Sequence, residues 1–459
     1  MPQRAPSLPL DRLAPQVAGL SARGRPDYER ARAQAIWNKR LDSAHSPDAI
    51  IRCANARQVA AAIRFAATHG LRVALRGSGH SYIAAPLRDG GLLLDCGGMD
   101  DIAIDPENRS ARVGPGTRGG DLIEALAGHG LAFPIGHCST VALGGYLLSG
   151  GLGWNQGTWG PACNHVTAIE AVTAEGDIVH ASETEHPDLF WAARGAGCGF
   201  FAAVTAYHLR LHPMPLAAWL WTASFPAASA PALRLWLNAA TRAAHPAAEI
   251  MCLIGPDPHG GAPSLTIRAV AMADTAAEAR EHVASFRSPP KGIEPISGPS
   301  EQSLSFPELT GLSHMPDGKR VAADQLWSDH PPGDLLVAVH RLIDRPHAPS
   351  TINLVSPGGN GRIPAMPDEA AGALSVGGGL SAGIYAMWDD PAQDDLHCAW
   401  VRAVDAALAP FAAGRYVGEA DLGAASGRVA ECFSAPALAR LEATRRRYDP
   451  DGRFFTFPG

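Results

Sequence analysis

At 459 residues the chain is too long for a single hydrophobic core, which predicts two or three domains. Its hydrophobic fraction of 46% predicts a packed globular protein, and its formal net charge of −7 disfavours a nucleic-acid or anionic-membrane partner. Every apolar run is shorter than the roughly 20 residues that a membrane-spanning helix requires.

The eight cysteines and 18 histidines have no spacing typical of a metal site. Neither C-x-x-C nor H-E-x-x-H occurs, so no metal is expected. Residues 1–24 contain scattered arginines and prolines but no apolar core of a signal peptide. We therefore expect reduced cysteines and a cytoplasmic location.

The first half of the chain predicts helices interspersed with short strands. Asn55 can cap a helix that runs to about His69 and ends at Gly70. The alternation of apolar residues over 71–75 predicts a strand that leads into Arg76. Further strands are expected at 91–95 and 102–104, and a further helix at 121–128. This mixture indicates an α+β fold rather than a regular βαβ repeat.

Two glycine-rich segments each contain one nucleophilic side chain. Residues 76–82 read Arg-Gly-Ser-Gly-His-Ser-Tyr and contain His80, and residues 136–146 read Gly-His-Cys-Ser-Thr-Val-Ala-Leu-Gly-Gly-Tyr and contain Cys138. Glycines let backbone approach a ligand closely, and exposed N–H groups can bind phosphate. Taken singly, either side chain also fits a structural role. Together they predict a cofactor held close to both nucleophiles.

These two segments resemble the flavin-attachment segments of the berberine-bridge-enzyme-like flavoproteins, whose second segment reads G-x-C-P-T-V-G-V-G-G-H in plant members. The similarity is dense over residues 37–215, thin in the middle and present again from about 399. The other matching stretches are 149–154, 170–176, 188–195, 199–205 and Tyr448-Asp449-Pro450. The resemblance implies an α+β fold of the vanillyl-alcohol-oxidase superfamily.

The resemblance also implies how the chain is divided. Residues 1–215 would form a two-part FAD-binding domain of the PCMH type, and 216–398 a substrate domain with an antiparallel sheet covered by helices. Residues 399–459 would return to the FAD-binding domain. A change to a composition rich in proline and glycine after residue 215 agrees with the first boundary.

The cofactor implied by the resemblance is FAD attached twice, to His80 at the 8α-methyl group and to Cys138 at C6. Its pyrophosphate would lie against the backbone N–H groups of residues 77–81. The residues expected to contact FAD are His80, Cys138, Arg76, Gly77, Ser78, Gly79, Ser81, Tyr82, Val141, Gly144, Gly145, Gly150, Gly151, Gly153 and Val204.

The residues that would activate a substrate depart from the family pattern. Alcohol-oxidising members carry a tyrosine where this chain has Leu152, and a Y-x-N-Y motif where it has Tyr416-Val417-Gly418-Glu419. A polar residue expected on the strand before Trp388 falls near Gly383.

The remaining candidates are one acid and two phenols. Glu419 is the candidate general base, because a buried carboxylate with a raised pKa can accept a hydroxyl proton. Tyr416 or Tyr146 would be its hydrogen-bonding partner.

We expect a flavoprotein oxidase that oxidises the hydroxyl group of a sugar or secondary metabolite. In the family a valine at the position of Val141 goes with oxygen access, so O₂ would be the second substrate and H₂O₂ a product. The alternatives are a flavin-dependent dehydrogenase, an oxidative cyclase and a flavin-binding protein without turnover.

Overall fold

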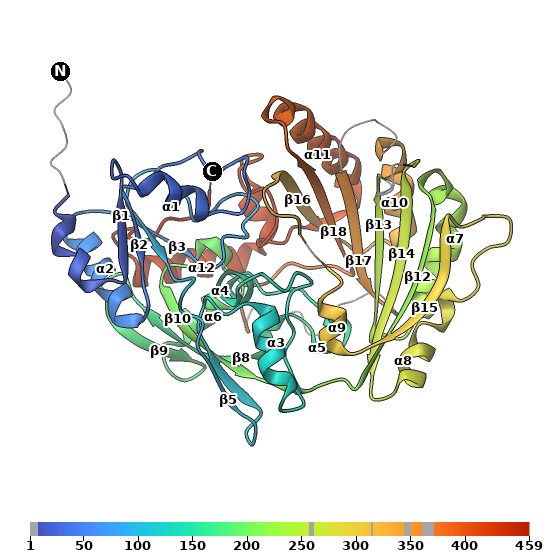
Figure 1. Ribbon diagram of the computed structural model, residues 1–459, viewed down its shortest axis with the longest axis horizontal. Coiled ribbons are helices and arrows are strands. Elements are labelled where there is room, and N and C mark those ends of the chain that lie inside the picture. Colours follow the sequence, from blue (N-terminus) through green and yellow to red (C-terminus); the bar gives the residue numbers. More distant parts are fainter. Residues whose placement is uncertain (1–7, 257–260, 314, 344–349, 360–370, 459) are drawn as a thin grey trace.

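The computed structural model describes residues 8–256, 261–313, 315–343, 350–359 and 371–458. Figure 1 shows a first lobe built mainly from the N-terminal half and a second lobe built on one large sheet. This mixture of helices with largely antiparallel sheets confirms the predicted α+β fold class.

The first lobe contains a four-stranded sheet and a five-stranded sheet. The four-stranded sheet has the order β1 (Gly19–Ala22), β2 (Ala49–Arg52), β4 (Leu92–Asp95) and β3 (Val73–Arg76). The five-stranded sheet has the order β5 (Ile102–Asp105), β6 (Ser110–Val113), β10 (Ala203–Arg210), β8 (Val166–Val172) and β9 (Ile178–Ser182). A two-stranded ladder joins β7 (Leu131–Ala132) to β11 (His212–Pro213).

The helices of this lobe pack around the two sheets. They are α1 (Tyr28–Gln34), α2 (Ala56–Thr68), α3 (Gly119–Ala127), α4 (Leu143–Leu148), α5 (Gln156–Trp159) and α6 (Pro187–Ala193). The Asn55 side chain accepts a hydrogen bond from the Gln58 N–H and so caps α2, as predicted. Apolar residues recur on one face of α2 and are buried: Val59, Ala60, Ala62, Ile63 and Ala66.

The second lobe is an eight-stranded antiparallel sheet. Its order is β15 (Ser297–Leu304), β12 (Ala217–Pro226), β14 (Ser264–Ala273), β13 (Ala248–Gly255), β17 (Ser350–Pro357), β18 (Leu380–Trp388), β16 (Arg320–Ser328) and β19 (Ala412–Gly414). The sheet contains residues from both sides of position 398, and the division of the chain at 215 and 398 stays a proposal.

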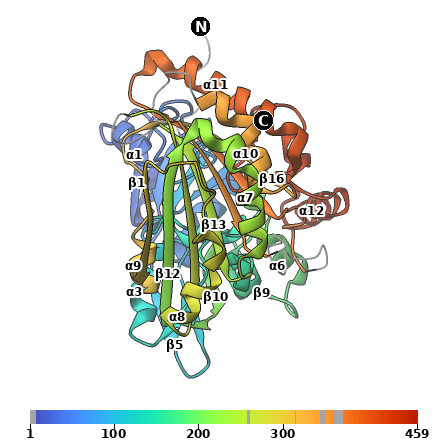
Figure 2. The same cartoon turned by 90° about the vertical axis from the view of Figure 1, so that its right-hand side faces the viewer.

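Helices cover one face of the large sheet, and the other face is turned toward the first lobe (Figures 1 and 2). The covering helices are α7 (Ala230–Ala243), α10 (Pro332–Ile343) and α11 (Asp394–Leu408), while α8 (Ala276–His282) and α9 (Phe306–Thr310) lie near its β12 side. Successive residues of a strand point to opposite faces. Apolar residues at alternate positions, such as Ile250, Cys252 and Ile254 of β13, therefore join the core beneath the helices.

The C-terminal segment packs on the first lobe. Helix α12 (Ala435–Tyr448) contacts α6, and the chain then runs beside β3. There the Val73 N–H donates to the Arg453 carbonyl at 2.7 Å, and the Phe455 N–H donates to the Val73 carbonyl at 3.0 Å. Strand β3 leads directly into the first glycine-rich segment, so this contact also supports that segment.

Two kinds of feature are absent from the described residues. No helix among them has the length and apolar character needed to cross a bilayer. No group of three or more histidine, cysteine, aspartate or glutamate side chains among them could hold a metal ion.

Candidate active site

A cavity of about 600 Å³ is lined by residues of both lobes. The first lobe contributes the two glycine-rich segments, and the second lobe contributes side chains from β13, β14, β17 and β18. The loop that follows α9 and residues 416–419 line it as well. The cavity brings together most of the site residues predicted from the sequence.

Strand β3 ends at Arg76, which fixes the start of the first segment. The Arg76 guanidinium donates to the Ala35 carbonyl at 2.9 Å and to Asp95 Oδ1 at 2.7 Å. Gly79 has a φ of +82°, and a Cβ there would lie 2.5 Å from the Ala35 carbonyl oxygen. Only glycine fits this turn without strain, so the sequence itself shapes the loop.

The backbone of the first segment offers free donors. Within the described part of the chain, none of the backbone N–H groups of residues 77–82 donates a hydrogen bond. Residues 77–82 also line the cavity. Because buried backbone N–H groups are nearly always paired, an unpaired run facing a cavity is suited to an anionic group such as phosphate. This arrangement fits the pyrophosphate of the expected FAD.

The two predicted nucleophiles are linked through one hydroxyl group. Thr140 Oγ1 lies 3.0 Å from His80 Nε2 and 3.2 Å from Cys138 Sγ. The His80 ring stacks on Trp37, with ring centroids 5.7 Å apart. Burial lowers the pKa of His80, so its imidazole is held in the neutral, nucleophilic form. Both side chains line the same cavity and can reach one ligand.

The second segment is fastened to the first. Ser78 Oγ accepts a hydrogen bond from the Ala142 N–H at 2.9 Å. A Cβ on Gly144 would lie 2.8 Å from the Pro115 carbonyl oxygen, so a glycine lets α4 approach that loop. Val141, Gly144, Gly145 and Val204 line the cavity, and their contact with FAD stays a prediction.

Three of the predicted cofactor-contacting glycines lie outside the cavity lining. Gly150, Gly151 and Gly153 instead allow neighbouring chain segments to pack. A Cβ on Gly153 would lie 1.9 Å from the Ile135 carbonyl oxygen, and one on Gly150 would lie 2.7 Å from Leu374. These three glycines therefore shape the chain segments that pack behind the cavity.

The two phenols expected to help catalysis have their hydroxyl groups engaged with backbone. Tyr146 donates to the Pro134 carbonyl at 3.2 Å, and the Tyr416 hydroxyl accepts from the Gly151 N–H at 3.1 Å. Burial raises the pKa of both phenols. Their rings line the cavity, and their hydroxyl groups hold the wall together.

Glu419 faces the cavity and is paired with a different tyrosine. Tyr385, on β18, donates its hydroxyl proton to Glu419 Oε2 at 2.7 Å. The Tyr82 ring lies beside that of Tyr385, with centroids 5.5 Å apart. Burial raises the pKa of Glu419, although the Tyr385 hydrogen bond and His137 act in the opposite direction. A raised pKa makes this carboxylate a better proton acceptor than an ordinary exposed glutamate.

Two glycines that depart from the family pattern make room for tyrosines. A Cβ on Gly383 would lie 2.3 Å from the Tyr385 hydroxyl oxygen. A Cβ on Gly418 would lie 2.7 Å from the Tyr416 ring. Residues 383 and 385 share one face of β18, so the polar group expected near Gly383 is supplied two positions later.

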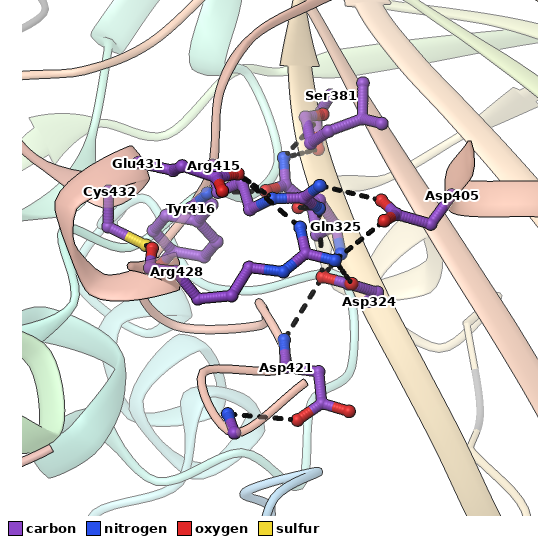
Figure 3. Close-up of polar contacts among 12 residues, drawn as sticks. Asp324, Gln325, Ser381, Asp405, Arg415, Tyr416, Asp421, Arg428, Glu431 and Cys432 are labelled. Atoms are coloured by element: carbon purple, nitrogen blue, oxygen red, sulfur yellow. Dashed lines mark hydrogen bonds and ion pairs between the residues drawn. The ribbon is translucent and has the colours of Figure 1, made fainter. Parts of the chain in front are cut away.

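A buried ion cluster holds the segment that carries Glu419 (Figure 3). The Arg415 and Arg428 guanidiniums lie among the carboxylates of Asp324, Asp405 and Glu431. Arg428 to Asp324 is 2.9 Å and Arg415 to Asp405 is 2.8 Å. The Asp421 N–H also donates to Asp324 at 3.1 Å. The cluster therefore anchors both sides of Glu419 to β16 and α11.

A second carboxylate in this region belongs to an ion pair. Glu249, only 3% exposed, lies 2.6 Å from His137 Nε2, and the His137 ring packs against Trp154. Burial opposes protonation of His137, but the Glu249 carboxylate outweighs it and raises the His137 pKa. The pair thus places a histidine with a raised pKa next to Cys138 in the chain.

Sequence reasoning did not single out Thr140, Glu249, Arg268 or Tyr385. Thr140 is within the second segment, where its polarity was the available signal. The other three come from strands of the large sheet, at alternate positions of otherwise apolar runs. A polar side chain on one face of an otherwise apolar, buried strand is the signal that points to them.

Comparison with known proteins agrees with this geometry. The model of an FAD binding domain family matches residues 47–182. The FAD-linked oxidoreductase nodO of Hypoxylon pulicicidum is 29% identical over 93% of this chain and 94% of its own length. The (R)-6-hydroxynicotine oxidase of Paenarthrobacter nicotinovorans is 29% identical over 91% of this chain and 92% of its own.

The fold is shared with a solved structure of the berberine-bridge-enzyme-like group. BBE-like 1 of Physcomitrella patens superposes with a TM-score of 0.83 at 20% identity. The match covers 98% of this chain and 99% of the other. At this identity the likeness establishes the fold.

Proposed function

We propose that this chain, which is similar to FAD-linked oxidoreductases and has the fold of the berberine-bridge-enzyme-like flavoproteins, is an alcohol oxidase with bicovalently attached FAD. Its substrate would be the hydroxyl group of a sugar or secondary metabolite. O₂ would be reduced to H₂O₂. The observation that carries the proposal is the Glu419 carboxylate, held by Tyr385 in the cavity that His80 and Cys138 also line.

Attachment at both His80 and Cys138 is supported by their shared link to Thr140. The hydroxyl can exchange a proton with either nucleophile, because it is both a donor and an acceptor. A neutral imidazole and a thiolate are the nucleophilic forms of these two side chains, and burial favours the neutral form of His80. Two bonds would hold the cofactor in one orientation.

The chemistry that bound FAD would supply is hydride acceptance, followed by transfer of the electron pair to O₂. The chain's own contribution is to bind the alcohol and remove its proton. The Tyr385 hydroxyl donates a hydrogen bond to Oε2 of Glu419, and no group among the described residues donates one to Oε1. Oε1 is therefore the atom that would accept the hydroxyl proton. Tyr385 fixes the carboxylate, and the Arg415–Arg428 cluster fixes its loop.

The choice of O₂ as second substrate rests on Val141. Its side chain lines the cavity, and in the family a valine at this position goes with oxygen access. A leucine would add one methylene group at the same place. We also propose that the protein works in the cytoplasm, since all eight cysteines are free.

A substrate panel under anaerobic conditions tests the function. An alcohol substrate should bleach the flavin absorbance, and admission of air should restore it with stoichiometric H₂O₂. Slow recovery in air would indicate a dehydrogenase, and a product with a new ring bond would indicate an oxidative cyclase. Failure of every alcohol to bleach the flavin, with ligand binding unchanged in Glu419→Gln, would indicate binding without turnover.

A further inference from the structure

Arg268 places a positive charge in the wall of the cavity. It lies on β14, where it pairs in register with Met251 of β13 and with Thr222 of β12. Its neighbours along the strand, Ile267 and Ala269, join the core beneath the helices. The Arg268 side chain therefore faces the cavity, which it lines together with Met251 and Leu253.

No acidic side chain among the described residues neutralises this charge. Within the described part of the chain, the Arg268 side chain makes no hydrogen bond, ion pair or ring contact. Burial lowers its pKa, and no acidic neighbour acts in the opposite direction. By contrast, Arg415 and Arg428 are each surrounded by carboxylates. A partly buried guanidinium without a partner is costly, so its position indicates a ligand that supplies the anion.

We propose that Arg268 binds a carboxylate group of the substrate, an inference that rests on the proposed function because it takes this cavity as the substrate site. A guanidinium presents two parallel N–H donors that match the two oxygens of a carboxylate. The substrate would then be a hydroxy acid, such as a sugar acid or an acidic secondary metabolite.

The charge balance favours a carboxylate over a phosphate. On the second-lobe side Arg268 contributes one positive charge and Glu419 is acidic, while the other lining arginines, Arg76 and Arg88, lie on the first-lobe side. A phosphate monoester carries nearly two negative charges at pH 7 and would leave about one of them unpaired. Thr351 and Asn353 of β17 line the same wall and add a hydroxyl and an amide for further hydrogen bonds. A single negative charge with polar neighbours suits this wall.

The test compares charged and neutral probes of the same shape on the purified protein with its flavin. The pairs are benzoate with benzamide and acetate with acetamide, followed by isothermal titration calorimetry and by the flavin difference spectrum. Wild-type protein should bind each carboxylate about tenfold or more tightly than its amide, because a charge-assisted bidentate pair is lost in the amide.

Three variants locate the effect. Arg268→Met should abolish the preference and leave amide binding unchanged, and Arg268→Lys should keep part of it, since the charge remains without the fork. Arg280→Met is the control: its guanidinium pairs with Glu301 outside the cavity lining, so the preference should persist.

Several results would overturn the proposal. They are equal affinity for charged and neutral probes, no saturable response to either pair, or a preference that survives in Arg268→Met. A loss of flavin from Arg268→Met would assign the guanidinium to the cofactor instead. Calorimetry does not depend on turnover, so absence of oxidase activity would refute the proposed function without deciding the anion preference.

Discussion

The two sides of the cavity are built in different ways. On the first-lobe side, His80, Thr140 and Cys138 lie in two short segments, and the link between them is a pair of contacts to one hydroxyl. On the second-lobe side, Glu419, Tyr385 and Arg268 come from a loop and two strands that are far apart in the sequence. The first-lobe side is thus built from residues close together in the sequence, and the second-lobe side from residues that only the fold brings together. We infer that the first side holds the cofactor, while the second side binds the substrate and accepts its proton.

The largest expected effect is on the substrate side. Glu419→Gln keeps the shape and the Tyr385 contact but removes the base, so kcat should fall by about 10²–10⁴-fold. The flavin content should not change. Stopped-flow reduction of the flavin by substrate measures this step directly. Unchanged reduction kinetics in Glu419→Gln would exclude it as the base.

The pH profile sharpens the same assignment. Burial raises the pKa of Glu419. As the pH falls, its carboxylate is therefore protonated at a higher pH than that of an ordinary glutamate. The kcat/KM of the wild type should therefore decline on the acid side through that raised pKa. The Glu419→Gln variant should not show this decline on the acid side. In Tyr385→Phe the midpoint of the decline should move to higher pH, because a hydrogen bond that stabilises the Glu419 carboxylate is removed.

The ion cluster behind Glu419 should carry a large share of stability. Arg428→Met leaves Asp324 and Asp405 buried without that partner, which costs about 3–5 kcal/mol of the free energy of unfolding. Arg447→Met is the matched control, since its side chain is 70% exposed and its pair with Asp188 lies at the surface. That variant should lose at most about 1 kcal/mol. Denaturant unfolding of both proteins gives the comparison, and equal losses would contradict the role of the cluster.

A smaller change should displace Tyr385. Gly383→Ala puts a methyl group where the Tyr385 hydroxyl lies, and such overpacking costs about 1–3 kcal/mol. The kcat/KM should fall, while flavin attachment stays complete because the first lobe is untouched. Gly128→Ala, where a Cβ meets nothing within 4 Å, serves as control. Normal kinetics in Gly383→Ala would show that Tyr385 does not position the base.

The smallest effect is expected on the cofactor side. Thr140→Val removes the hydroxyl between His80 and Cys138, and one hydrogen bond contributes about 0.5–1.5 kcal/mol, so covalent attachment should slow by about two- to tenfold. The fraction of protein with flavin still bound after denaturation, followed over time of expression, measures the rate. Ser139→Ala in the same segment should attach at the wild-type rate.

Features formed by residues that are close together in the sequence could be predicted, and those formed by residues far apart in the sequence could not. The cap at Asn55, the strand before Arg76 and the helix near 121–128 follow from local patterns, and the structure confirms them. The loops around His80 and Cys138 are each a single short stretch of sequence that matches a flavin-attachment segment of the family. Their meeting in one cavity could therefore be expected. Tyr385 could not be paired with Glu419 from sequence, because strand register decides which residue of β18 reaches the loop. The hydroxyl groups of Tyr146 and Tyr416 could not be placed either, since backbone groups of other segments capture them.

The central claim is that one FAD is joined to both His80 and Cys138. The most direct measurement is the intact mass of the denatured protein, followed by mapping of the flavin-bearing peptides after digestion. We expect one flavin per chain, which is retained after denaturation and links the peptide that contains His80 to the peptide that contains Cys138. Flavin released on denaturation, or retained on only one of the two residues, would contradict it.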